Sequence, residues 1–228
     1  MAVENLINEL AADLDGYATN RRFPRELSRD EAAEVAAFLH EQIDRGVEAR
    51  DQAIAKSSAT LACTRGCNRC CEEPIMVFRP ESAQVARWLA RPENAAARDW
   101  FVAAYPAWKE RIGETLERLS QVFVAEPTRY VAEHVSAWRA GVLCPFNREG
   151  DCTVYPVRPY VCRAAHALET NEHCGGESTT PATRATFVPL DQFIARARRL
   201  IVAAHNAMPG DRGRVGALPH TVFAMLAT

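Results

Sequence analysis

Apolar residues recur three or four positions apart through most of this chain, the spacing that places them on one face of an α-helix. Such a stripe runs through residues 3–14 and predicts the first helix. The second predicted helix begins after Ser28, because Ser28 and Glu31 have the spacing of a capping box. It extends to about Ala55, with its apolar stripe expected to be buried.

The same periodicity predicts further helices along the rest of the chain. A long amphipathic pattern covers residues 100–123, and we expect its Pro106 to begin a new helix rather than lie inside one. Thr128 is the predicted N-cap of the next helix, and Gly141 is its predicted end. The remaining helices are predicted over residues 81–90, 189–204 and 222–226.

Two segments depart from this helical pattern. Residues 75–78 resemble a strand but are too short to found a sheet. From Gly141 to Pro181 periodicity disappears, and an irregular stretch of this length inside a domain needs a special reason. Ligation to a metal supplies one. We therefore predict a mainly α single domain wrapped around an irregular, cysteine-rich metal-binding core.

The chain is expected to divide into three segments. Residues 1–58 form N-terminal helices, residues 59–181 form a cysteine-cluster domain with inserted helices, and residues 182–228 form C-terminal helices that pack on the same core.

Cysteine is the most informative residue type in this sequence, which contains eight. Thiolate sulfur selects zinc, copper(I) and iron–sulfur clusters over magnesium or calcium. Four sulfurs fall within nine residues, and a second cysteine-rich stretch follows about seventy residues later. The predicted metal ligands are Cys63, Cys67, Cys70, Cys71, Cys144, Cys152, Cys162 and Cys174.

Spacing alone leaves the division of these ligands open. Cys63, Cys67 and Cys70 fit one ion or cluster from a single loop, while Cys71 should point elsewhere because adjacent side chains diverge in extended backbone. The eight sulfurs can form two four-cysteine sites, or one cluster with spare thiols. His166 and His173 flank the later cysteines and are alternative ligands.

Charge and composition argue against two classes of partner, nucleic acid and membrane. The net charge of -2 argues against nucleic-acid binding by phosphate neutralisation. No apolar run is long enough for a membrane span, and the first ten residues carry acids where a signal peptide carries bases. We expect a cytoplasmic protein, a compartment in which clustered cysteines serve metal or redox chemistry more often than disulfides.

Two motifs in order then resemble a known family. Cys63-x3-Cys67-x2-Cys70-Cys71 is followed by Cys144-Pro-Phe and by Cys152-x2-Tyr155-x2-Arg158-Pro-x2-Cys162-Arg163. Together they are similar to the YkgJ-type cysteine-cluster family, described as zinc- or iron-chelating. The resemblance covers roughly residues 60–165 and implies metal ligation by the seven cysteines within it. Cys174 lies outside it, and its assignment rests on the cysteine count.

The same module also occurs in a class of enzymes, but the resemblance does not imply an enzymatic activity for this chain. Flagellin lysine methylases resemble this family in sharing such a module, but this chain matches the module alone.

Residues beside the cysteines are assigned supporting roles. Arg158 and Arg163 are predicted to offset the charge of a bound cofactor, because a divalent ion held by four thiolates carries a formal charge of -2. Tyr155 is expected to pack beside the site. The four histidines on predicted helices are expected at the surface or at helix ends; they are His40, His134, His205 and His220.

Three functions compete at this point. The first is a zinc-binding or structural metalloprotein, and the second is an iron–sulfur protein with a redox or modifying activity. The third is a thiol redox sensor that uses Cys70 and Cys71. The sequence identifies a metal ion or cluster as partner, leaves a protein partner open, and assigns neither catalytic residues nor a substrate.

Overall fold

The computed structural model describes residues 3–20, 23, 26–64, 66–123, 125–210 and 215–227. These residues form eight α-helices with little sheet, and 67% of the chain is helical. The predicted mainly α class is confirmed. Within the described residues, no helix combines the length and the apolar character that a membrane span needs.

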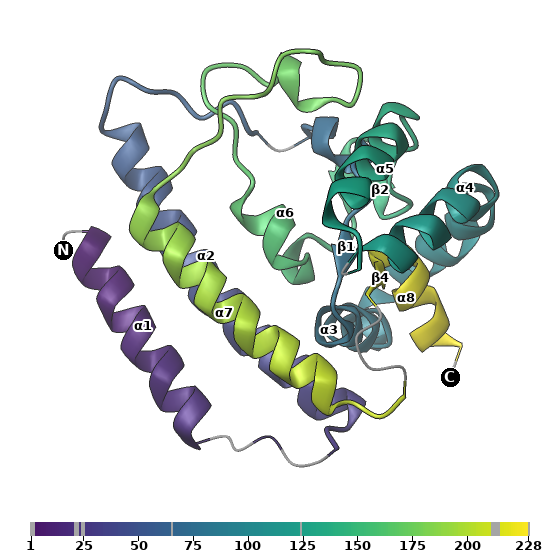
Figure 1. Ribbon diagram of the computed structural model, residues 1–228, viewed down its shortest axis with the longest axis horizontal. Coiled ribbons are helices and arrows are strands. Elements are labelled where there is room, and N and C mark those ends of the chain that lie inside the picture. Colours follow the sequence, from purple (N-terminus) through teal and green to yellow (C-terminus); the bar gives the residue numbers. More distant parts are fainter. Residues whose placement is uncertain are drawn as a thin grey trace.

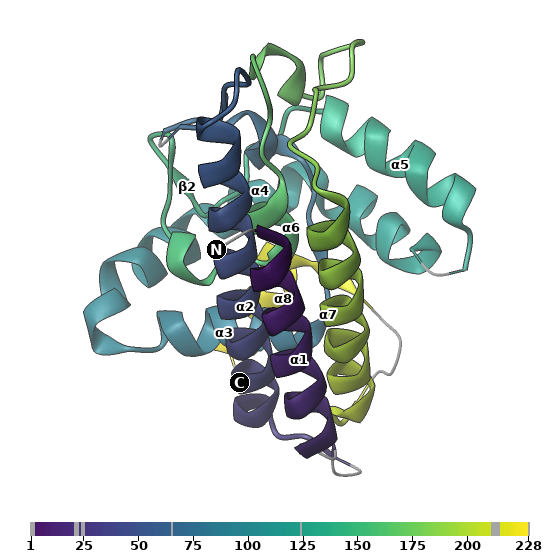
Figure 2. The same ribbon diagram turned by 90° about the vertical axis from the view of Figure 1, so that its left-hand side faces the viewer.

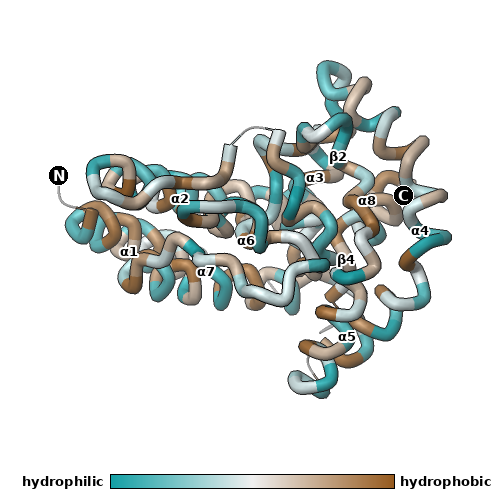
Figure 3. Tube along the Cα trace, turned by 90° about the horizontal axis from the view of Figure 1, so that it is seen from above, coloured by the Kyte–Doolittle hydropathy of each residue, from teal (hydrophilic) through white to brown (hydrophobic). Residues whose placement is uncertain are grey.

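Three long helices make one side of the molecule. They are α1 (Val3–Asn20), α2 (Arg29–Ala55) and α7 (Val188–Ala207), and they run side by side in Figures 1 and 2. Each turns an apolar stripe toward the others, which appears as alternating hydropathy along the tube in Figure 3. Fully buried leucines and isoleucines from all three helices fill the space between them; these include Leu10, Leu39, Ile43, Leu190 and Ile201.

A glycine lets two of these helices approach closely. A Cβ atom added at Gly46 of α2 would lie 2.6 Å from Leu190 Cδ1 of α7. A larger residue at this position would require the Leu190 side chain to move.

The other side of the molecule is built from four helices around a second hydrophobic cluster. They are α3 (Arg79–Leu89), α4 (Ala95–Val122), α5 (Pro127–Arg139) and α8 (Leu218–Leu226), with the short 3₁₀ helix η2 (Pro92–Asn94) before α4. Phe101 of α4 stacks on Phe146 at 4.2 Å between ring centroids, and Tyr105 stacks on Phe223 at 3.9 Å. This second cluster thereby reaches into the cysteine-rich segment.

The two sides meet where α2 packs against α3. A two-residue strand, β1 (Met76–Val77), leads into α3 and pairs antiparallel with β4 (Gly216–Ala217), Met76 opposite Ala217. The strand-like look of residues 75–78 is thus confirmed as a short element.

Several predicted helix ends are confirmed and two are wrong. Ser28 and Glu31 form the capping box of α2, and Gly141 follows α5 with a positive φ of 61°. Pro106 lies inside α4, because apolar residues before and after it enter one buried cluster and offset the missing backbone hydrogen bond. The N-cap of α5 is Glu126 rather than Thr128, since Pro127 takes the first helical position.

The cysteine-rich segments contain only short elements. The first stretch has the 3₁₀ helix η1 (Arg69–Glu72). The second has the hairpin of β2 (Asn147–Arg148) and β3 (Asp151–Cys152), then η3 (Tyr155–Val157), α6 (Tyr160–Ala164) and η4 (Glu172–Cys174). The N-terminal α1 and α2 pack on α7 and not only on residues 59–181. The division into three segments stays a prediction.

Candidate metal centre

The first cysteine stretch lies against the end of the second. Residues 60–62 run antiparallel to residues 167–169, with the Ala62 N–H donating to the Ala167 carbonyl at 2.9 Å. The Ala167 N–H in turn donates to Cys63 Sγ at 3.2 Å, and Asn171 Nδ2 donates to Cys67 Sγ at 3.4 Å. Because η1 also contacts η4, Cys174 on η4 is brought to the same side.

Cys71 lies against a different part of the second stretch. Its carbonyl accepts the Cys144 N–H at 2.8 Å, and its Sγ accepts Asn147 Nδ2 at 3.6 Å. Asn147 pairs with Cys152 across the β2–β3 hairpin. A Cβ atom added at Gly150 of that hairpin would meet the Gly66 carbonyl oxygen at 3.1 Å, so the hairpin also touches the first stretch.

A buried polar network positions the helix that carries Cys162. The Tyr160 N–H, in the first turn of α6, donates to Glu81 Oε1 at 3.1 Å. Glu81 is fully buried, lies 3.4 Å from His40 Nε2, and also accepts the Phe78 N–H. The middle of α2 and the first turns of α3 and α6 are therefore joined through one carboxylate.

Arg163 of α6 is a second anchor. Its guanidinium is nearly buried and donates to the carbonyls of Pro156 and Arg158, at 2.7 and 2.6 Å, and to the carboxylate of Asp44 on α2. These bonds hold the loop between Cys152 and Cys162 against α2. The predicted role of Arg163 toward a cofactor stays a prediction.

The positive charge of Arg158 acts on the thiols of two cysteines. Burial raises the pKa of the Cys152 and Cys162 thiols, and the positive charge of Arg158 opposes the rise in both. Its guanidinium also sits over the Tyr155 ring, 3.6 Å from the centroid. Tyr155 is 59% exposed, and its ring packs under the Arg158 guanidinium at the surface. Its place beside a bound metal stays a prediction.

All eight cysteines are free thiols, seven of them half-buried and Cys70 exposed. Burial raises the pKa of Cys144 to about 12 and that of Cys162 well above its ordinary value. The pKa of Cys70 is raised chiefly by its hydrogen bond with Cys71. Cys70, Cys144 and Cys162, with their raised pKa values, therefore keep their protons at neutral pH without a cation nearby.

The donor set fits a soft metal in its chemistry. It offers several thiols, and N–H groups already donate to three of the sulfurs, which is the hydrogen bonding that supports bound thiolates. Within the described residues, however, no three cysteine, histidine or carboxylate side chains come close enough together to hold one ion. The cysteine-bearing segments lie together, but among the described residues their sulfur atoms do not converge on one point.

The alternative histidine ligands have other partners. His166 Nδ1 lies 2.7 Å from Asp51 Oδ2 and 3.0 Å from Arg50 Nη2. His173 Nδ1 is 3.3 Å from Ser178 Oγ. The prediction that the helical histidines lie at the surface or at helix ends is wrong for His40, which is buried in the middle of α2 because α3 packs over it. His205 is also buried, but it lies in the last turn of α7, at a helix end as predicted.

Sequence reasoning missed the groups that donate to sulfur. Asn147 lies three residues after Cys144, and Asn171 lies three residues before Cys174. An amide side chain that close to a cysteine is a signal that could have found them. The Ala167 N–H leaves no trace in the sequence, since any residue supplies a backbone donor.

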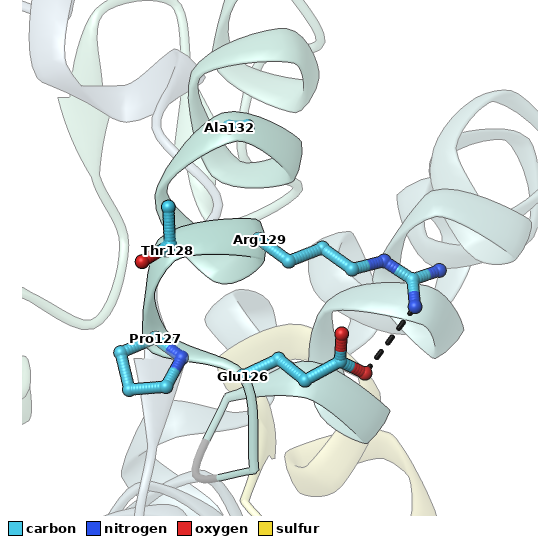
Figure 4. Close-up of a pocket in the computed structure, with 5 residues that line it drawn as sticks. All are labelled: Glu126, Pro127, Thr128, Arg129 and Ala132. Atoms are coloured by element: carbon cyan, nitrogen blue, oxygen red, sulfur yellow. Dashed lines mark hydrogen bonds and ion pairs between the residues drawn. The ribbon is translucent and has the colours of Figure 1, made fainter.

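Two of the hollows on the described surface lie near α2 and at the start of α5. A groove of about 510 Å³ runs between α2 and the loop from Cys152 to Cys162, with Asp44, Asp51, Arg158, Arg163 and His166 among its lining residues. Figure 4 shows the other, at the start of α5, where Glu126 and Arg129 form an ion pair at 3.3 Å. No cysteine lines either one.

A family model matches residues 62–180, just over half of the chain, and its description reads "CxxCxxCC: Putative zinc- or iron-chelating domain". This chain belongs to the CxxCxxCC family. The match confirms the resemblance read from the motifs and extends it past Cys174. Membership in the CxxCxxCC family supports metal binding in general. No curated protein and no solved structure matches the chain significantly.

Proposed function

We propose that this protein holds zinc or an iron–sulfur cluster through its cysteines, with ligands from both stretches. One observation carries the proposal: two segments far apart in sequence lie together, and the sulfurs of Cys63, Cys67 and Cys71 accept N–H bonds from the later one. A soft cation that replaces the thiol protons would turn this assembly into a closed site.

The raised pKa values weigh against the thiol-sensor alternative. A reactive cysteine is one whose pKa is lowered by a neighbouring cation or helix terminus. Here burial and neighbouring thiols raise the pKa of Cys63, Cys144 and Cys162, and Cys71 raises that of Cys70. Metal binding would lower all of them, because thiolate is the ligand form.

Anaerobic purification with elemental analysis and a visible spectrum on one sample tests the proposal. Zinc in a colourless solution identifies a binding or structural centre. Iron with acid-labile sulfide and a brown colour identifies a cluster, and with it the redox or modifying alternative. Protein that carries neither metal, and takes up neither on reconstitution, would refute the proposal.

Two cysteine variants, one from each stretch, extend the test. Cys67→Ser and Cys162→Ser should each lower bound metal and soluble yield, because each removes a ligand. Tyr155→Phe is the matched control, since its exposed ring lies beside the same loop and offers no sulfur. Unchanged metal content in either serine variant would contradict the ligand assignment.

A further inference from the structure

A buried arginine near the C-terminal end of α2 fixes the segment whose backbone donates to Cys63. We propose that Arg50 and Asp51 are positioning residues of the metal centre. Through His166 they hold the Ala167 N–H on Cys63 Sγ and so set the bond of this sulfur to metal. The inference rests on the proposed function, that Cys63 is a metal ligand, and adds the residues that prepare it.

Arg50 joins α2 to two later segments of the chain. Its side chain is only 3% exposed, and Nη1 donates to the carbonyls of Ala164 at 3.1 Å and Ala185 at 3.0 Å. The Ala185 N–H in turn donates to the His166 carbonyl at 2.8 Å. One guanidinium therefore holds both sides of the backbone pairing that contains His166.

A buried guanidinium destabilises a fold unless its N–H groups find acceptors. At Arg50 all three nitrogens have them, because Nη1 has the two carbonyls, while Nε and Nη2 lie 2.9 and 2.8 Å from Asp51 Oδ1. The other oxygen of this carboxylate, Oδ2, lies 2.7 Å from His166 Nδ1. Asp51 therefore links Arg50 to the imidazole ring of His166.

Ala167 follows His166 directly, and its own bonds continue the arrangement. The Ala167 N–H donates to Cys63 Sγ at 3.2 Å, and the Ala167 carbonyl accepts the Ala62 N–H at 2.9 Å. The next N–H, that of Leu168, donates to the Thr183 carbonyl at 2.8 Å. Because the chain is held on both sides of Ala167, its N–H has little freedom to turn away from the sulfur.

The donor to Cys63 differs in kind from the other two described donors to sulfur. An N–H group withdraws charge from a metal-bound thiolate, and such outer-shell partners affect metal affinity. Asn147 and Asn171 supply carboxamide N–H groups, which are aimed by side-chain rotation. Cys63 receives a backbone N–H, whose direction only the surrounding fold can set. Arg50 and Asp51 supply that constraint.

The variant Arg50→Lys tests the inference. Lysine keeps the charge, but its single nitrogen cannot reproduce the fork that spans two carbonyls and a carboxylate. Arg45→Lys is the matched control, because Arg45 lies on the same helix and pairs with Asp13 at 3.6 Å, with both side chains partly exposed.

The readout is alkylation of each cysteine by iodoacetamide in the metal-loaded protein purified anaerobically, followed by peptide mass spectrometry. Loss of the N–H donor leaves more charge on the Cys63 sulfur. In Arg50→Lys, Cys63 should therefore react about fivefold faster relative to Cys152, the equivalent of one ordinary hydrogen bond. The affinity for zinc, measured by competition with a chelator, should fall about tenfold. Arg45→Lys should match the wild type in both measurements.

The ratio of Cys63 to Cys152 separates positioning from a general contribution to stability. A looser fold would speed the alkylation of both cysteines together, so an unchanged ratio would overturn the inference. Asp51→Asn keeps the shape of the side chain and removes its charge. It should raise the same ratio, and it decides the question if Arg50→Lys does not fold.

The outcomes also separate this inference from the proposed function. Wild-type protein that holds metal, with a wild-type ratio in both Arg50→Lys and Asp51→Asn, refutes the positioning role and leaves metal binding in place. Wild-type protein that holds no metal refutes both.

Discussion

The layer of α1, α2 and α7 and the cysteine-bearing segments are stabilised in different ways. In the layer, long helices bury whole side chains, and residues such as Leu39 and Ile201 have no exposed surface. In the cysteine-bearing segments the elements are two to five residues long, and seven of the cysteines are only half-buried. The helical layer is thus stable by apolar burial, while the cysteine-bearing segments need bonds to sulfur.

The two regions are joined at α6. Glu81 and Arg163 tie this five-residue helix to α2 and α3, so Cys162 is placed by the scaffold. The first cysteine stretch has no comparable buried anchor to α2 or α3 among the described contacts; its bonds go to residues 144, 147, 167–171 and 177. We expect the helical scaffold and a bound metal both to contribute to the order of the site.

Metal removal is expected to produce the largest difference in behaviour between the two regions. After anaerobic chelation, amide protons of residues 60–72 and 144–174 should exchange with solvent faster by orders of magnitude, since local order is lost. Amides in the middle of α2 and α7 should stay protected. Hydrogen exchange read by mass spectrometry checks this, and equal loss in both regions would remove the distinction.

Glu81→Ala tests the connection between the regions. It removes the acceptor of two backbone N–H groups and the partner of His40 in a fully buried place. The free energy of unfolding should fall by about 3 kcal/mol. Urea denaturation of the metal-loaded protein measures it, with the exposed Glu117→Ala on α4 as control. A loss no larger than that of the control would show that the network contributes nothing.

Acid should weaken the scaffold through His205. Burial, with Arg79 nearby, lowers the pKa of this histidine from 6.5 to about 4 in the folded chain. The unfolded chain therefore binds more protons between these values, so the free energy of unfolding falls as the pH drops from about 6.5 toward 4. His40, whose pKa burial also lowers, acts in the same direction.

The variant His205→Gln isolates this contribution, because glutamine does not titrate. Its free energy of unfolding should fall less steeply than that of the wild type from pH 6.5 to 4, whatever its value at pH 7. Parallel pH profiles for the two proteins would rule out a role for His205.

The smallest effect concerns two glycines in open space. Gly141 has a φ of 61° and no heavy atom within 4 Å of an added Cβ, so Gly141→Ala should cost about 1 kcal/mol through backbone strain alone. Gly16 is equally open but lies inside α1 with an ordinary φ, so Gly16→Ala should stabilise by about 0.5–1 kcal/mol. Thermal unfolding of both variants gives the comparison, and shifts of the same sign would contradict it.

Much of the scaffold is predictable because its causes are local. The capping box at Ser28 and the stripe of α2 lie within a few residues of the helix they form. Pro106 is the exception, since its place inside α4 depends on packing with a distant cluster. The residues next to Pro106 do not reveal this tertiary packing, which overrides the low helix propensity of proline.

The candidate site divides in the same way. The cysteines stand out by residue type and spacing, so the sequence could name them. The pairing of residues 60–62 with 167–169, and the bond of Cys144 to Cys71, join segments about seventy to a hundred residues apart. The buried His40 and Glu81 were missed because burial of a polar pair is decided by tertiary packing.

X-ray absorption at the metal edge tests the central claim, that cysteines of both stretches hold the metal, most directly. Protein purified anaerobically should show a shell of sulfur at about 2.3 Å around zinc, or sulfur and iron shells for a cluster. Cys67→Ser and Cys162→Ser should each lower the mean sulfur count. A shell of nitrogen and oxygen, or a sulfur count that responds to one stretch alone, would contradict it.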